Sequence, residues 1–162
     1  MMPDDFEEET GRDDTLERQQ YEEDNSFVED FISLQRALEN PIYDKVNPHF
    51  NHPFASLESV IKSTIKVANK FNFAIVQELI NDDEKGIGCS THIMHRNGVN
   101  RIFGPFFVQP VNASPHGAGS AATYAKRYSL MAIFGVGGET DDDGNAASPV
   151  PSNNFDQLEE LQ

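Results

Sequence analysis

The stretch from Gly117 to Leu130 carries residue types that bind nucleic acids: glycines, then a predicted helix with two tyrosines and two cations. Glycines before a helix let the backbone approach a ligand closely, and the free N–H groups of a first helical turn favour an anion. Cations and aromatic rings on one face hold a phosphate and stack on a base. On residue chemistry alone, an ordinary core helix after an ordinary loop is an equally good interpretation.

A helical wheel gives the predicted helix, about 119–134, two different faces. Small residues gather on one face, which predicts close packing on a sheet: Ala121, Ala122, Ala125, Ser129 and Ala132. The opposite face carries Thr123, Tyr124, Arg127, Tyr128 and Met131. A mixed cationic and aromatic face fits single-stranded nucleic acid better than it fits a core. Lys126 points elsewhere on the wheel.

Three lysines form a second candidate contact with a phosphate backbone. Lys62, Lys66 and Lys70 are four residues apart on a helix predicted at 57–70, so they follow one stripe along it. Ser56 is the predicted N-cap of this helix. The stripe is either a solvated face, with Glu58 paired to Lys62, or a surface that follows phosphates.

Two arginines flank a predicted hairpin turn. Asn97-Gly98 is a strong signal for a tight turn between strands, and Arg96 and Arg101 stand on either side of it. Both side chains are therefore candidates to project from one end of a hairpin.

Histidines and a cysteine occur at spacings that suggest a metal, as in His49-x-x-His52 and Cys89-x-x-His92-x-x-His95. In a strand, however, Cys89 and His95 share one face while His92 points to the other, so the three do not converge on zinc. A metal site is therefore not expected.

Patterns for catalysis are also incomplete. A P-loop requires Gly-x-x-x-x-Gly-Lys-Ser/Thr, and no such run exists, so ATP-driven chemistry is not expected. Asp141-Asp142-Asp143 is predicted to be a solvated acidic turn, with a weak Mg²⁺ contact left open. No catalytic set with suitable spacing stands out, and no cofactor is expected.

The net charge of −15 is unevenly distributed. Residues 1–40 carry −11 and residues 140–162 carry −6, whereas residues 41–139 carry +2. The acidic total argues against nucleic acid, but a mildly basic core between two acidic arms does not. The arms are expected to be solubilising tails, or less often to bind a basic partner.

The elements that must position these residues follow from the apolar patterns. Helices are predicted at 26–39, 57–70 and 119–134, and strands at 71–80, 87–95 and 99–111. Short connections favour antiparallel neighbours, so the α-β-β-β-α order predicts an α+β domain with helices on one face of a small antiparallel sheet. Residues 25–147 are expected to form this domain, between a disordered acidic arm at 1–24 and a flexible acidic tail at 148–162.

A reducing compartment is expected from the single cysteine, Cys89, which has no internal partner for a disulfide. The sequence has neither a run of about eighteen apolar residues nor the basic start of a signal peptide. These observations predict a cytoplasmic protein without membrane contact.

Taken together, these residues show that the chain resembles the essential recombination function (Erf) family of phage single-strand annealing proteins, over roughly residues 30–147. The most specific part of the resemblance is Gly119-Ser120-Ala121-Ala122-Thr123-Tyr124-Ala125-Lys126-Arg127-Tyr128-Ser129-Leu130, followed by Asp141-Asp142-Asp143-Gly144-Asn145. A second block, Phe54-Ala55-Ser56-Leu57-Glu58, resembles the family's opening of the first core helix.

The resemblance implies an ATP-independent, non-catalytic protein of phage or prophage recombination in a bacterial host. Such a protein coats single-stranded DNA, pairs complementary strands, and works as a ring or filament of identical subunits. Helix 26–39 is the candidate for subunit contact. The residues expected to contact DNA are Lys62, Lys66, Arg96, Arg101, Gly117, Gly119, Ser120, Tyr124, Lys126, Arg127 and Tyr128.

Two alternatives to an annealing protein stay open at this point. One is a metal-dependent nuclease that uses Asp141–Asp143. The other is an adaptor whose acidic arms recruit a host single-strand-binding or replication protein.

Overall fold

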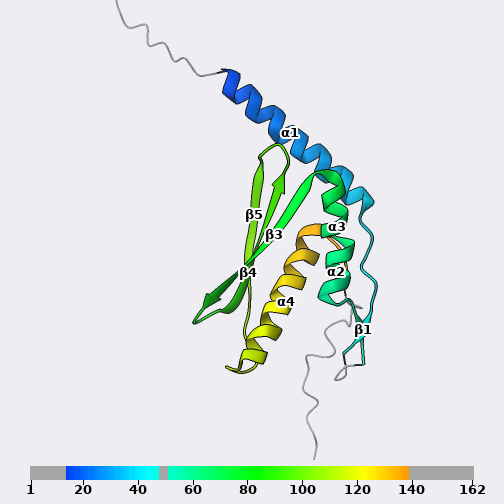
Figure 1. Cartoon of the computed structure of the whole chain (residues 1–162), viewed down its shortest axis with the longest axis vertical. Coiled ribbons are helices and arrows are strands. Elements are labelled where there is room, and N and C mark those ends of the chain that lie inside the picture. Colours follow the sequence, from blue (N-terminus) through cyan, green and yellow to red (C-terminus); the bar gives the residue numbers. More distant parts are fainter. Residues whose placement is uncertain (1–13, 48–50, 139–162) are drawn as a thin grey trace, which may run out of the picture.

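The computed structural model describes residues 14–47 and 51–138 (Figure 1). It confirms the predicted α+β class, because a three-stranded antiparallel sheet packs against the C-terminal helix. In chain order, the elements are α1 Asp14–Ala37, β1 Lys45–Val46, β2 Pro53–Phe54, α2 Leu57–Ser63, α3 Ile65–Ala68, the 3₁₀ helix η1 Asn69–Phe71, β3 Phe73–Asp82, β4 Gly86–His95, β5 Asn100–Val108 and α4 Pro115–Phe134.

The main sheet is an antiparallel meander in the order β3-β4-β5. The turn between β4 and β5 contains Asn97, whose side chain accepts a hydrogen bond from the Val99 backbone N–H at 3.0 Å. Gly98 follows with a φ of 99°, a conformation that residues with a Cβ rarely adopt. The hairpin predicted from Asn97-Gly98 is confirmed.

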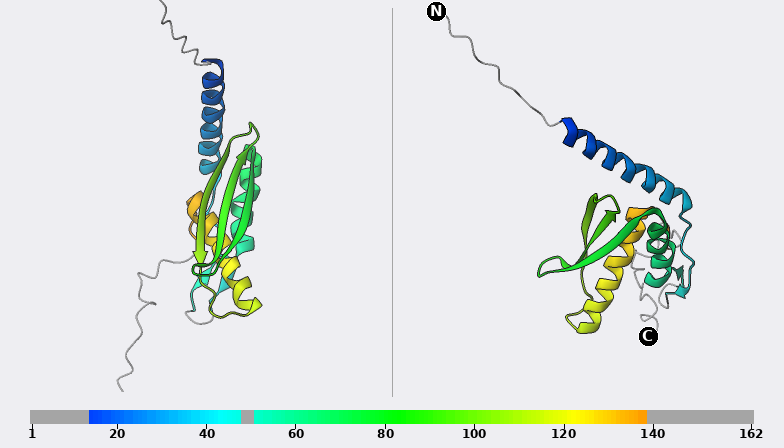
Figure 2. Two further views of the ribbon diagram at one scale, coloured as in Figure 1. Left: turned by 90° about the vertical axis from the view of Figure 1, so that its left-hand side faces the viewer. Right: turned by 45° about the horizontal axis from the view of Figure 1, so that its top comes forward.

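Helices cover one face of this sheet (Figure 2). Phe73 and Ile93 point to that face and are buried, and Gln77 donates a hydrogen bond to the Lys126 carbonyl of α4 at 3.0 Å. Because side chains alternate along a strand, their neighbours point to the opposite face. Ile102 of β5 lies there and is 61% exposed.

α1 closes the end of the sheet that carries the β4–β5 hairpin (Figure 1). Leu34 is fully buried, and the ring of Phe27 packs edge-on against Phe73 with centroids 5.2 Å apart. Asp30 accepts a hydrogen bond from Asn72 at 2.9 Å and lies 3.0 Å from Nε2 of the buried His95. These contacts, above all the Asn72 amide, hold the pKa of Asp30 below its ordinary value of 3.8.

The helix at the N-terminus is longer than predicted. Residues 14–24, expected to be disordered, are helical. Asn97 donates a hydrogen bond to the Glu23 carbonyl at 2.7 Å, and Arg101 pairs with Asp24 at 2.6 Å, so the hairpin holds the helix about one turn before its apolar stripe begins at Phe27. Residues 1–13 and the predicted tail at 148–162 lie outside the described residues.

The helix predicted at 57–70 is divided into α2, α3 and η1. Its predicted N-cap is confirmed, because Ser56 Oγ accepts a hydrogen bond from the Ser59 backbone N–H at 3.2 Å. Thr64 interrupts the helix: it is buried, and its hydroxyl donates to the Val60 carbonyl at 2.6 Å. Such bonding from a threonine to the preceding turn bends helices.

A two-stranded sheet of β1 and β2 was not predicted. Lys45 lies opposite Phe54, and Val46 lies opposite Pro53. Asp44, beside β1, accepts hydrogen bonds at 2.7 Å from both the backbone N–H and the hydroxyl of Ser56. The small sheet thereby holds Lys45 and Phe54 beside the start of α2.

α4 begins four residues earlier than predicted. Ser114 caps it by accepting a hydrogen bond from the Gly117 backbone N–H at 3.1 Å, and Pro115 occupies the first turn, where no N–H is needed. Gly117 and Gly119 therefore lie within the helix rather than in a turn before it. The buried Gly117 leaves no room for a Cβ, which would collide with the Asn112 carbonyl.

Leu34→Ala should lower the free energy of unfolding by about 2–5 kcal/mol, because truncating a fully buried leucine leaves a cavity. Ile32→Ala, at a 43% exposed position of the same helix, should change it by less than about 1 kcal/mol. Urea unfolding followed by circular dichroism measures both. Equal effects would show that α1 does not pack on the domain in this orientation.

Candidate nucleic-acid interface

Arg127 of α4 lies at the centre of a group of aromatic rings. Its guanidinium carbon is 4.9 Å from the ring centroids of Phe54, Tyr124 and Tyr128. Nη1 donates a hydrogen bond to the Ala55 carbonyl at 3.0 Å. The residue is only 4% exposed, so three rings and a backbone carbonyl surround a buried cation.

This burial differs from the exposed position that the helical wheel predicted for Arg127. The wheel describes α4 alone, whereas the covering ring of Phe54 comes from β2, far away in the sequence. The wheel also misplaced Ala132: it predicted this residue on the buried packing face, but the residue is exposed. A guanidinium that is flat and always charged stacks well on aromatic faces. The structure therefore gives Arg127 a positioning role for the rings around it.

The rings continue from α4 to the last strand of the sheet. Tyr124 and Tyr128 are stacked with centroids 5.8 Å apart, and Phe106 of β5 lies 6.3 Å from Tyr128. Tyr124 is 42% exposed and Phe106 is 45% exposed. We call Phe54, Tyr124, Arg127, Tyr128 and Phe106 the arginine–aromatic cluster. Its exposed rings offer flat apolar surfaces on which bases can stack.

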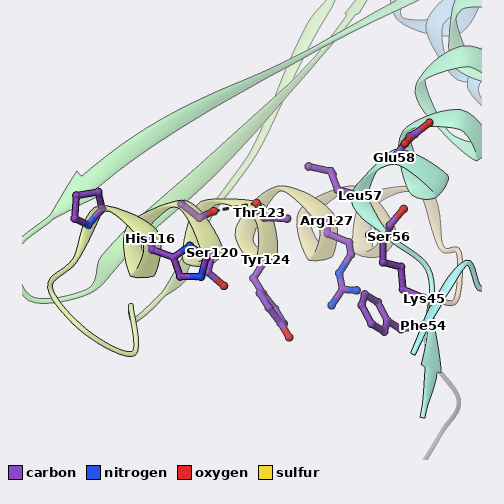
Figure 3. A pocket seen from close by; sticks show the side chains of 12 residues that line it. Lys45, Phe54, Ser56, Leu57, Glu58, His116, Ser120, Thr123, Tyr124 and Arg127 are labelled. Carbon is purple, nitrogen blue, oxygen red and sulfur yellow. Dashed lines mark hydrogen bonds between the residues drawn. The ribbon is translucent and has the colours of Figure 1, made fainter. Parts of the chain in front are cut away.

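A cavity of about 670 Å³ opens beside the cluster, between the start of α2 and the N-terminal half of α4 (Figure 3). In Figure 3, Phe54 lies against the guanidinium of Arg127, and Tyr124 lies farther along α4 toward Ser120 and His116. The lining combines aromatic, hydroxyl and charged groups: Lys45, Phe54, Ser56, Leu57, Glu58, Pro115, His116, Gly119, Ser120, Thr123, Tyr124 and Arg127.

The charges around this cavity are slightly positive in sum. Lys45 and Arg127 are cations, and Glu58 is the carboxylate among the lining residues. Glu58 forms an ion pair with Lys62 at 2.6 Å. The hydrogen bond from Lys62 lowers the pKa of Glu58 below its ordinary value of 4.5, and the same bond raises the pKa of Lys62. The carboxylate of Asp44 accepts hydrogen bonds from Ser56, and the Ser56 hydroxyl lowers the pKa of Asp44.

Five of the eleven residues predicted to contact DNA line this cavity or belong to the cluster beside it: Gly119, Ser120, Tyr124, Arg127 and Tyr128. Lys62 is exposed on α2 and reaches the cavity only through its ion pair with Glu58, whereas Lys66 is exposed one turn farther, on α3. Lys126 lies half-buried on another flank of α4, and Gly117 is a packing residue.

Arg96 and Arg101 lie at the other end of the domain, at the β4–β5 hairpin beside α1 (Figure 1). Arg101 pairs with Asp24 and stands 5.5 Å over the ring of Phe27. Arg96 donates to the Asn72 side chain at 3.4 Å. The predicted set is therefore divided between two ends of the molecule.

Several residues of the candidate interface were not predicted from the sequence: Lys45, Phe54, Phe106 and His116. Phe54 precedes the confirmed cap Ser56, but nothing in its spacing indicates that it meets Arg127. Phe106 was assigned only to a strand. Both become part of the interface through contacts between residues distant in the sequence.

Two other kinds of feature are not found within residues 14–47 and 51–138. These residues contain no group of three or more His, Cys, Asp or Glu that could hold a metal ion. Cys89 and the buried His95 share the covered face of β4, while His92 lies 3.7 Å from Glu78 on the opposite face.

Among the same described residues, no helix is long and apolar enough to cross a membrane. His49 and Asp141–Asp143 are outside the described ranges.

Comparison with known proteins gives one family match. The model of the ERF superfamily matches residues 27–160, which includes α1 from Phe27 onward, the sheet and α4. No curated protein and no solved structure matches the chain.

Arg127→Lys should lower the free energy of unfolding by about 2–3 kcal/mol, because an ammonium cannot stack flat against three rings while bonding Ala55. Arg36→Lys makes the same exchange at an exposed position of α1 and should change it by less than about 0.5 kcal/mol. Chemical denaturation compares them. An unchanged stability for Arg127→Lys would mean that the ring and carbonyl contacts of Arg127 do not stabilise the fold.

Proposed function

Since the chain belongs to the ERF superfamily of phage single-strand annealing proteins, we propose that it binds single-stranded DNA and anneals complementary strands without ATP. The observation that carries this proposal is the family match over residues 27–160. ERF annealing proteins are non-catalytic, so the chain is proposed to act by binding, in phage or prophage recombination within the host cytoplasm.

The arginine–aromatic cluster supports this function. Stacking on aromatic rings tolerates every base, because every base has a flat π-face. A protein that promotes pairing of any two complementary strands requires such tolerance. Contacts with the phosphate backbone would leave the edges of the bases available to a complementary strand.

The cations around the cluster are the proposed phosphate contacts. Lys62 pairs with Glu58 of the cavity, Lys66 follows it on α3, and Lys126 lies on another flank of α4. Ser120 of the cavity adds a hydroxyl. Arg96 and Arg101 form a separate group at the hairpin, where we propose a second contact with the strand. Phosphate contacts dominate the affinity of proteins for nucleic acid and make it dependent on salt.

One subunit offers few cations, so we propose that the protein acts as a ring or filament of identical subunits. Many weak contacts along one strand then add to a useful affinity. The apolar stripe of α1 packs on its own domain, so a subunit contact through α1 would use its exposed side, where Val28 and Ile32 are 50% and 43% exposed. The acidic residues near both ends remain candidates for recruiting a host single-strand-binding or replication protein.

The purified protein should speed the annealing of complementary oligonucleotides without ATP, and its affinity for single strands should fall as salt rises. Fluorescence anisotropy of a labelled oligonucleotide and gel analysis of annealed product measure the two activities. Absence of both activities would contradict the proposed function. Degradation of the strand with Mg²⁺ would favour a nuclease instead.

Lys66→Ala should reduce the slope of log affinity against log salt by about 0.7, the value for one lost contact on a single strand. Arg96→Ala should do the same if the hairpin also holds phosphate. Lys85→Ala removes an equal charge at the β3–β4 turn and should leave the slope unchanged. A slope that falls equally for Lys85 would indicate a general charge effect rather than these contacts.

A further inference from the structure

We propose that the cavity between α2 and α4 holds one nucleotide of the bound strand, with its base against the ring of Tyr124 and its phosphate toward Lys45. The inference rests on the proposed function and names the place where the strand is held. It adds Lys45 of β1 to the residues predicted to contact DNA, and it gives Gly119, already among them, a place in the α4 wall of the cavity.

The size and lining of the cavity suit a nucleotide. Its volume of about 670 Å³ falls within the usual range for small-ligand pockets, roughly 300–1,000 Å³. Tyr124 gives a partly exposed aromatic ring, and Ser120 on the same helix gives a hydroxyl for the sugar or the edge of a base. The Thr123 hydroxyl donates to the Gly119 carbonyl at 2.9 Å, which leaves its oxygen as an acceptor. The exposed Lys45 supplies a cation for the phosphate, while the buried Arg127 holds the rings beside it.

The glycine at position 119 indicates that this part of α4 binds a ligand rather than packing against the protein. It lies within α4, where glycine weakens a helix relative to alanine. A Cβ built on Gly119 would meet nothing within 4 Å, so packing does not require a glycine there. Gly117, two residues earlier, does have a packing reason, because its Cβ would collide with Asn112. Gly119 keeps the wall of the cavity open so that a ligand can approach the helix.

The ring of Tyr124 is held in place before any ligand arrives. Tyr128 stacks on it at 5.8 Å with an angle of 18° between the rings, and Arg127 lies 4.9 Å from its centroid. Arg127 is itself fixed by Phe54 and by the Ala55 carbonyl. A side chain fixed in this way loses little conformational freedom when a base stacks on it.

The test fills the cavity at Gly119 and compares stability with binding. Gly119→Ala and Gly119→Leu should keep or raise the unfolding midpoint, since both residues favour helix. Their affinity for single-stranded DNA should fall, and the leucine variant should lose at least about fivefold. Ala132→Leu, at an exposed position of the same helix outside the cavity, should bind as the original protein does.

The position of the base is tested by photocrosslinking an oligonucleotide that contains 5-iododeoxyuridine to the full chain. Crosslinked peptides identified by mass spectrometry should contain Tyr124 or Phe54. Tyr124→Phe should keep the affinity, while Tyr124→Ala should lower it about tenfold, the effect of one lost base stack.

The outcomes separate this inference from the proposed function. If the original protein binds and anneals strands while stable Gly119→Leu binds equally well, the cavity does not hold the strand and this inference is wrong. Crosslinks found only at the β4–β5 hairpin would also overturn it, leaving the annealing function intact. If the original protein neither binds nor anneals single strands, the proposed function fails and this inference fails with it.

Discussion

The buried guanidinium of Arg127 is the interaction on which the geometry of the interface depends. Through Ala55 and Phe54, it joins the middle of α4 to the segment between β2 and α2, 72 residues earlier in the chain. The Ala55 backbone N–H in turn donates to the Gly138 carbonyl at 2.8 Å, just beyond α4. One cation therefore aligns the two walls of the cavity and fixes the rings along it. Placing a charge in such surroundings is costly, and the rings and the carbonyl offset that cost.

This arrangement leaves the two ends of the domain with different chemical surroundings. At the end near the start of α4, aromatic rings and hydroxyls surround an open cavity. At the hairpin end, Arg101 and His95 are tied to carboxylates of α1, namely Asp24 and Asp30. The acidic helix thus pairs with the basic groups at one end, while the charged residues that line the cavity keep a small excess of positive charge.

The parts of the fold that sequence could predict are those set by short-range patterns. Alternating apolar residues and the Asn97-Gly98 pair identify the three strands and their order, and Ser56 identifies the start of α2. The parts that it could not predict depend on distant partners. The hairpin contacts of Glu23 and Asp24 on α1 come from Asn97 and Arg101, and the burial of Arg127 depends on Phe54. For the candidate site, the residues of α4 were predictable, but not those that β1, β2 and β5 bring to them.

The way in which α1 is attached has a mechanical consequence. Its contacts with the domain run from Glu23 onward, whereas residues 15–22 are exposed and continue the same helix past the sheet (Figure 2). These eight residues extend for about 12 Å as a stiff rod. A flexible segment would limit only the distance between the domain and a molecule bound to that segment. A rod joined firmly to the hairpin also fixes the angle, so a molecule that grips residues 15–22 sets the direction in which the whole domain, and its cavity, faces.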